Sequence, residues 1–262
     1  MLATKQGNLY DYPKYYDLVY GSDWKAEFDF LEACFEKHAD LEVRNIYEPA
    51  CGTGRLLIRF AKADYQVAGV DLNQHAIDYC NDRLQRAGFA PTAVVGDMCD
   101  FECEEPVDAA FNTINSFRHL TGEEQARNHL RAVAAALRPG GLYVLGLHLT
   151  PTTGQPLTEE SWAARRGNLA VLSRMWVTGH DRQRRQERVG MSFDVYTPTE
   201  QFRIEDQCAF RTYTAHQLET LLEKVAELEM TAVYDFSYDI DNPVSVGPET
   251  EDVIYILKKR VK

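Results

Sequence analysis

The sequence predicts an α/β fold with a doubly wound, mostly parallel sheet of seven strands and an antiparallel subdomain inserted after the fifth strand. Between residues 41 and 150, short apolar runs alternate with helical stripes, which is typical of parallel strands joined by crossover helices. The apolar runs are nearly continuous, as expected for strands covered on both faces. From about residue 168 to 213 the period changes to the strict alternation of half-buried antiparallel strands.

The composition fits a globular protein with a sizeable core. Of the 262 residues, 45% are apolar and 26% are charged, so no structural staple is needed. The formal net charge of −12 repels phosphate backbones and makes nucleic acid a poor candidate for a partner. No apolar run approaches the ~20 residues of a membrane span, and no signal-peptide pattern opens the chain. We therefore expect no membrane partner and a cytoplasmic location.

The six cysteines are scattered and contain no Cys-x-x-Cys pair, which indicates reduced thiols packed as small apolar side chains. Cys99 and Cys103 are close in sequence. No cysteine or histidine pair follows them at the spacing of a zinc site, so we expect no bound metal.

Residues 1–40 are expected to form a tyrosine-rich strap followed by a helix. The helix, predicted from Trp24 to His38, has apolar residues at helical spacing and Ser22 or Asp23 as its N-cap. The strap contains Tyr10, Tyr12, Tyr15, Tyr16 and Tyr20. It is either a packing element or a lid over a ligand, in which Tyr12 and Tyr16 would offer hydroxyl contacts.

A glycine-rich turn follows the first predicted strand of the core. The strand covers 45–49 and carries Glu48 near its end, and a helix is expected to begin near Arg55. Gly52 and Gly54 accept positive φ and let the backbone approach a ligand closely. A strand, a glycine turn and a helix N-terminus in this order are typical of a Rossmann-like nucleotide site.

The other core elements follow at regular spacing. Strands are predicted at 66–71, 92–95, 107–112 and 142–149. Asn73 is expected to cap a helix that ends near Gly88, and Thr121 with Glu124 to form the capping box of a helix through Leu137.

The insert is assigned to residues 151–213, and residues 214–262 complete the core. Strands of the insert are expected at 169–176, 188–195 and 202–210. A helix at 215–228 and strands at 231–236 and 253–257 then close the chain.

The carboxyl ends of the parallel strands meet at one edge of the sheet, where such folds bind ligands. Asp71 is placed to accept the two hydroxyls of a ribose, and Asp97 to accept from an adenine amino group. Leu72 and Met98 would enclose the ring between them. The segment from 112 to 120 faces the space beyond.

Four segments together resemble the successive motifs of class I S-adenosylmethionine-dependent methyltransferases: 48–54, 69–72, 96–98 and 137–141. Glu48 beside the turn suits the cationic amino group of a methionine moiety better than a pyrophosphate, which disfavours a nicotinamide dinucleotide. The resemblance implies S-adenosylmethionine as cofactor and S-adenosylhomocysteine as product. The residues assigned to the cofactor are Tyr16, Glu48, Ala50, Cys51, Gly52, Gly54, Arg55, Asp71, Leu72, Asp97, Met98, Asn112 and Asn115.

The segment 15–20 and the insert resemble those of small-molecule N-methyltransferases, including enzymes that act on aminosugars or glycine-type amines. This resemblance implies that the insert covers the acceptor site or makes a contact in a homodimer. The sequence Asn112-Thr113-Ile114-Asn115 replaces the Asn/Asp-Pro-Pro-Tyr/Phe motif of base-amino methyltransferases, which further disfavours nucleic acid.

Methyl transfer from a sulfonium is an in-line displacement, so the protein mainly supplies alignment and desolvation. His119, His148 and Tyr16 are the candidate catalytic residues, and His119 is expected to have a pKa suited to a base at neutral pH. Each histidine is alternatively a hydrogen-bonded structural residue. O-methylation of a small molecule and binding of S-adenosylmethionine without turnover remain the alternative functions.

Seven arginines fall between Arg165 and Arg188. They form either a solvated face of the inserted sheet or a site for a phosphate or carboxylate, which arginine forks hold well.

Overall fold

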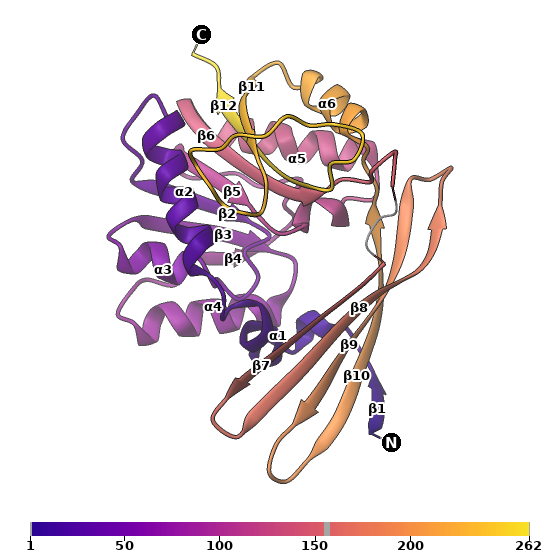
Figure 1. Cartoon of the computed structure of the whole chain (residues 1–262). Coiled ribbons are helices and arrows are strands. Elements are labelled where there is room, and N and C mark those ends of the chain that lie inside the picture. Colours follow the sequence, from indigo (N-terminus) through magenta and orange to yellow (C-terminus); the bar gives the residue numbers. More distant parts are fainter. Residues whose placement is uncertain (1, 155–157, 262) are drawn as a thin grey trace.

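The computed structural model describes residues 2–154 and 158–261, and these form two sheets joined by the helix α1 (Pro13–Tyr20) and by the connections of the insert (Figure 1). The larger sheet has seven strands in the order β11-β12-β6-β5-β2-β3-β4. Its strands are β2 (Asn45–Pro49), β3 (Gln66–Asp71), β4 (Ala93–Val95), β5 (Val107–Asn112), β6 (Leu137–His148), β11 (Leu228–Tyr234) and β12 (Asp252–Lys259). The pairs from β4 to β6 are parallel, whereas β12 is antiparallel to both of its neighbours.

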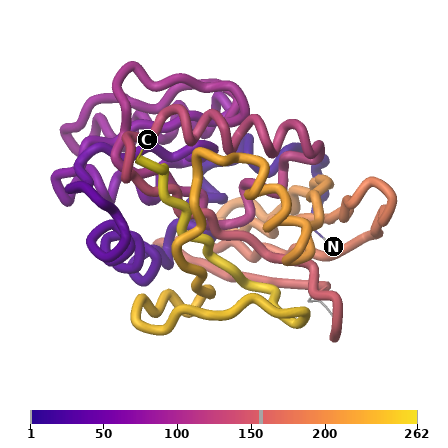
Figure 2. Tube along the Cα trace, turned by 90° about the horizontal axis from the view of Figure 1, so that it is seen from above, coloured from indigo at the N-terminus to yellow at the C-terminus, as the bar shows by residue number. Residues whose placement is uncertain are grey.

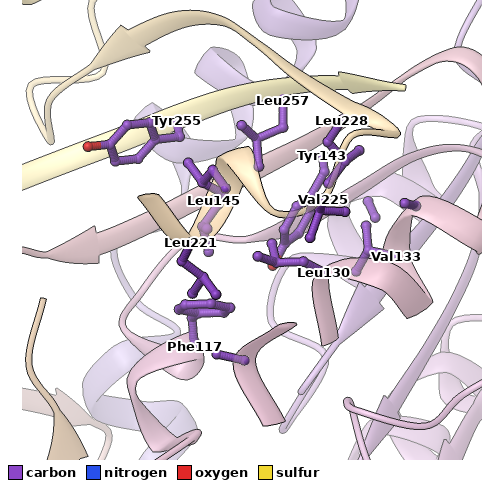
Figure 3. Packing of buried hydrophobic residues seen from close by; sticks show 14 of the residues in the cluster. Phe117, Leu130, Val133, Tyr143, Leu145, Leu221, Val225, Leu228, Tyr255 and Leu257 are labelled. Atoms are coloured by element: carbon purple, nitrogen blue, oxygen red, sulfur yellow. The ribbon is translucent and has the colours of Figure 1, made fainter. Parts of the chain in front are cut away.

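Helices pack on both faces of this sheet and form two apolar cores. The helices are α2 (Lys25–His38), α3 (Leu57–Lys62), α4 (Gln74–Arg86), α5 (Glu123–Ala136) and α6 (Ala215–Glu223). Residues of α2, α3 and α4 share one core, and residues of α5 and α6 share the other. Figure 3 shows part of the second core, where Phe117, Leu130, Tyr143 and Leu221 point toward one another.

The smaller sheet has five strands in the order β1-β10-β9-β8-β7. They are β1 (Ala3–Gln6), β7 (Glu159–Arg166), β8 (Leu169–Asp181), β9 (Gln186–Tyr196) and β10 (Gln201–Arg211). The strands β7 to β10 form an antiparallel meander, and β1 joins β10 in parallel. The amino terminus therefore lies beside the insert, as Figures 1 and 2 show. The predicted fold class is confirmed.

The tyrosine-rich strap forms the one-turn helix η1 (Leu9–Asp11) and the helix α1 (Pro13–Tyr20). Leu9, Leu18 and Val19 are buried in a third apolar core, against the inner face of the smaller sheet. Helix α1 contacts β7 and β8 on one side and α4 on the other.

Several predicted helix ends are corrected. Helix α2 has Trp24 as its N-cap residue without a side-chain cap, so neither Ser22 nor Asp23 serves. Helix α5 is capped at Gly122, whose N–H donates to the side chain of Gln125, in place of the expected box of Thr121 and Glu124. The predicted cap at Asn73 is present, since its side chain accepts from the N–H of Ala76.

No helix in the described part of the chain is long and apolar enough to cross a membrane.

Candidate functional site

The carboxyl ends of the parallel strands of the larger sheet bring the predicted site residues to one edge. The glycine-rich turn after β2 has the conformation that its sequence requires. Gly52 has φ +53° and Gly54 has φ +64°, a region that side chains with a Cβ rarely adopt. A Cβ on Gly54 would lie 2.3 Å from the sulfur of Cys80, so the turn packs directly on α4. Ala50 also has a positive φ, of 56°, and holds a mildly strained backbone at the start of the turn.

Asp71 fixes this turn from the end of β3. One carboxylate oxygen accepts from the N–H of Gly52 at 2.8 Å, and the other accepts from the N–H of Asn73 at 2.8 Å. Burial raises the pKa of Asp71, and the two backbone N–H groups partly oppose that rise. Each oxygen keeps a second lone pair, so the carboxylate can still accept from the hydroxyls of a ribose.

Glu48 is a buried carboxyl group without a full set of partners. Its side chain is 7% exposed, and its Oε2 atom has no hydrogen-bond partner among the described residues. Burial raises the pKa of Glu48 well above its usual value, while the nearby Arg55 opposes that rise. A cation or a hydrogen-bond donor bound at this edge of the sheet would stabilise such an atom.

Arg55 is held by a partner that the sequence did not indicate. Its guanidinium makes two bonds to the carboxylate of Glu27 on α2, at 2.5 and 2.7 Å, and the pair is almost fully buried. The helix that was expected to begin near Arg55 begins at Leu57. In this structure Arg55 therefore ties α2 to the turn.

Asn112 and Met98 belong to a buried hydrogen-bond chain. The amide of Asn112 donates to the carbonyl of Pro49, and its oxygen lies 2.7 Å from the Tyr143 hydroxyl. The hydroxyl of Tyr143 is 2.7 Å from Nε2 of His129, whose Nδ1 donates to the carbonyl of Met98 at 2.8 Å. This chain fixes the ends of β2 and β5 and the segment after β4 relative to one another.

The two residues expected to enclose an adenine ring, Leu72 and Met98, differ in how far they are exposed to solvent. The side chain of Leu72 is 70% exposed, whereas Met98 is 6% exposed and packs in the core. Asp97 is exposed, and one of its oxygens accepts from the N–H of Cys99 at 2.8 Å. An open apolar side chain therefore lies next in sequence to Asp71.

Tyr16 and Tyr10 bring the strap to this edge. Burial raises the pKa of Tyr16, and the charges of Asp71 and Glu48 add to that rise, so the hydroxyl lies near these two carboxyl groups. The hydroxyl of Tyr10 lies 3.0 Å from Nε2 of His119 and forms a hydrogen bond with it. The same strap reaches the start of α4, because Asp11 accepts from the side chain of Asn73 at 2.7 Å.

His119 lies in the short helix η2 (Ser116–His119) after β5, packed edge-on against the ring of Phe210. Burial, with help from the charge of Arg118, lowers the pKa of His119 to about 4. The expectation of a pKa suited to neutral pH is therefore wrong, because the ring is enclosed by the insert and the strap. His119 is neutral at physiological pH.

His148 and Asn115 lie at the same edge. Asn115 has φ 54°, and its side-chain oxygen accepts from the N–H of His148 at 2.8 Å. The imidazole of His148 lies 3.6 Å from the carboxylate of Asp252 and packs on Phe236. Burial lowers the pKa of His148, and Asp252 opposes that effect.

Besides Glu27, the partner of Arg55, two site residues were missed in the sequence, Tyr10 and Asp17. Tyr10 was counted only as part of the strap, and nothing linked it to His119. Asp17 accepts from the hydroxyls of Thr53 and Tyr79 and pairs with Arg83, which anchors α1 to the glycine turn and to α4. An acidic residue among tyrosines on one helix was the only available signal.

Comparisons with known proteins match the part of the chain that carries most of these residues. Residues 46–141 match the family model described as a methyltransferase domain. A sugar N,N-dimethyltransferase from Streptomyces venezuelae, named for dTDP-3-amino-3,4,6-trideoxy-alpha-D-glucopyranose, is 30% identical over 138 residues, or 52% of this chain and 56% of that protein. The chain spans about half the length of the characterised relatives that it matches.

Solved structures match over nearly the whole chain. An S-adenosylmethionine-dependent methyltransferase from Clostridium acetobutylicum has a TM-score of 0.76 at 20% identity and covers 97% of this chain and 100% of its own. DesVI from Streptomyces venezuelae has a TM-score of 0.75 at 20% identity, covering 96% and 99%. The chain therefore has the fold of the class I S-adenosylmethionine-dependent methyltransferases, and the resemblance found in the sequence is confirmed.

Proposed function

We propose that the protein transfers a methyl group from S-adenosylmethionine to a nitrogen atom of a small molecule. The observation that carries this proposal is the buried carboxyl oxygen of Glu48, which has no partner among the described residues. It belongs to the strand before the glycine turn, which Asp71 fixes by accepting from the N–H of Gly52. A cationic amino group satisfies this oxygen, whereas a pyrophosphate would meet a like charge.

The residues present fit the cofactor. Glu48 would receive its amino group, the backbone of Gly52 and Gly54 would lie along it, and Asp71 would accept its ribose hydroxyls. Leu72 offers an exposed apolar surface for its base. The cofactor supplies a methyl group already activated on a positively charged sulfur, so the protein needs only to exclude water and align the acceptor.

The acceptor side is assigned to Tyr10 and His119. Burial raises the pKa of Tyr10 well above its usual value, so the hydroxyl keeps its proton. With the His119 proton on Nδ1, the hydroxyl would donate to Nε2. A proton leaving the acceptor nitrogen would reach the oxygen of Tyr10 while the hydroxyl proton passes to His119, which makes His119 the general base. His148, at the end of β6, is the second candidate.

The alternatives are O-methylation and binding of the cofactor without turnover. An alcohol needs stronger deprotonation than a neutral amine, and a buried imidazole with a pKa of about 4 is a weak base. This favours nitrogen. Incubation with radiolabelled S-adenosylmethionine and a panel of amines, alcohols and nucleotide sugars tests the proposal. Label in an amine supports it, label only in alcohols replaces nitrogen with oxygen, and cofactor binding without label in any acceptor identifies a binding protein.

We expect the strap to order over the cofactor. Chymotrypsin should cut between Tyr10 and Tyr20 more slowly in the presence of S-adenosylhomocysteine, because the ligand would bridge the strap to the sheet edge. Amino-terminal sequencing of the fragments locates the cut. Equal rates with and without the ligand would show that the strap is a fixed packing element.

We also propose a small-molecule acceptor as the main partner, with no role for nucleic acid or membranes, and a cytoplasmic location. The net charge of −12 and the six free cysteines support these proposals. A homodimer through the insert is compatible with its mostly exposed edge strand β7, and sedimentation at several protein concentrations tests it.

A further inference from the structure

Three cationic side chains converge on a single carboxylate at the far end of the insert. Glu123 is the first residue of α5. Its Oε1 atom lies 2.7 Å from Nζ of Lys224, and its Oε2 atom lies 3.4 Å from Nη2 of Arg211 and 3.6 Å from Nη1 of Arg185. Arg185 comes from the turn before β9, Arg211 from the end of β10, and Lys224 from the end of α6. Positive charges outnumber the negative charge by three to one in a chain whose net charge is −12.

The two guanidinium groups have unused hydrogen-bonding capacity. Arg211 is 6% exposed and donates to the carbonyl of Thr121 at 2.9 Å, yet its Nε atom is buried without a partner among the described residues. The Nε atom of Arg185 and the hydroxyl of Tyr213 are likewise buried without a partner in the part of the chain that the structure describes. Both guanidinium groups lie over the ring of Tyr213, with distances to its centroid of 5.3 and 5.5 Å.

Glu123 is a replaceable partner for these cations. Its side chain is 45% exposed, at the surface end of the cluster, so it can turn into solvent without unfolding α5. A single carboxylate carries one negative charge, and two of its three contacts are longer than a good charge-assisted hydrogen bond. A group with two negative charges and three acceptor oxygens matches the cluster better, and the N-terminus of α5 adds a positive end.

We propose that Arg185, Arg211 and Lys224 form a binding site for a dianionic phosphoryl group, which takes over the contacts that Glu123 makes in this structure. The site adjoins the segment that carries His119, because Arg211 follows Phe210, whose ring contacts His119, and its guanidinium donates to the carbonyl of Thr121. The proposal does not depend on the methyl-transfer activity.

Titration calorimetry with inorganic phosphate at low ionic strength, in buffers free of sulfate, tests the site in the full chain. Lys224→Gln should weaken phosphate binding by roughly tenfold, the effect of losing one charge-assisted hydrogen bond. Glu123→Gln should instead tighten it by roughly tenfold, because the competing charge is removed. The opposite signs of these two changes separate a binding site from a purely structural ion cluster.

Arg182→Gln is the matched control, since Arg182 is an exposed arginine on the same turn as Arg185. It changes the net charge as Lys224→Gln does and should leave phosphate binding unchanged. No phosphate binding in either the wild type or Glu123→Gln would overturn the proposal. Equal weakening by Lys224→Gln and Arg182→Gln would also overturn it. Thermal melting of each variant verifies the fold, and Arg185→Gln serves as a second variant if Lys224→Gln melts early.

A parallel titration with thymidine 5′-diphosphate identifies the source of the phosphoryl group. If the group is part of a nucleotide-bearing ligand, the diphosphate should bind at least roughly tenfold tighter than phosphate and respond to the same variants. If free phosphate is the ligand, the two should bind alike. In both cases the site stands.

Discussion

Replacing Asp71 by alanine should weaken the binding of S-adenosylhomocysteine by at least ~1.5 kcal/mol, or roughly tenfold. The carboxylate has two roles in this structure, since it accepts from the N–H groups of Gly52 and Asn73 and faces the space assigned to the ribose. The variant thus loses direct contacts and also the tie that holds the glycine turn. Titration calorimetry measures the loss.

Asp78→Ala is the control for this variant, because Asp78 is an exposed carboxylate on the adjoining helix α4. It should bind S-adenosylhomocysteine like the wild type. Asp71→Asn keeps one acceptor oxygen without the charge and should show an intermediate loss. Binding of a nicotinamide dinucleotide by the wild type, with no response to S-adenosylhomocysteine, would contradict the cofactor assignment itself.

The parts of the site that the sequence predicts well are local ones. The strand, the turn with Gly52 and Gly54, and the carboxylate of Asp71 lie on neighbouring elements, so the order of strands and helices already brings them to one edge. The signal is strong because each residue has a backbone task. Positive φ demands glycine, and a free N–H demands an acceptor.

The contacts that the sequence does not predict join distant segments. Tyr10 and His119 are 109 residues apart, and Arg55 and Glu27 are 28 apart on different elements. The periodic pattern of apolar residues does not predict such pairs, because they depend on how the strap and α2 pack on the sheet. The pKa of His119 was misjudged for the same reason, since it depends on burial by segments far away in the chain.

A different reason explains why two strands of the smaller sheet, β1 and β7, are not predicted from the sequence. β1 is exposed at all four of its residues, and β7 is mostly exposed, so neither shows the alternation of a half-buried strand. Both lie at edges of the sheet, where one neighbour supplies the hydrogen bonds and polar side chains are tolerated. Only the partner strand defines them.

The proposed role of His119 as base leads to a specific pH dependence. With a pKa of about 4 the imidazole is neutral, and therefore able to accept a proton, at any pH well above that value. Turnover should accordingly show no step near pH 6.5 from this histidine, and it should fall only as the pH approaches about 4. A rise with pH at higher values would then report the acceptor amine losing its own proton.

Replacing His119 by alanine should lower turnover by about 10²-fold, the lower end of the range for loss of a general base, because burial makes this imidazole a weak base. Affinity for S-adenosylhomocysteine should hardly change, since most of the residues assigned to the cofactor lie on other strand ends. Tyr10→Phe breaks the 3.0 Å hydrogen bond to Nε2 and should lower turnover in the same way, with little further loss in the double variant.

His75→Ala is the control, because His75 is exposed on α4, away from these contacts. Turnover of His119→Ala within about threefold of the wild type, with the fall near pH 4 retained, would show that the imidazole only packs against Phe210 and supports the insert. A neutral amine can attack unaided once it is desolvated, so that result would leave the methyltransferase assignment in place and remove only the base.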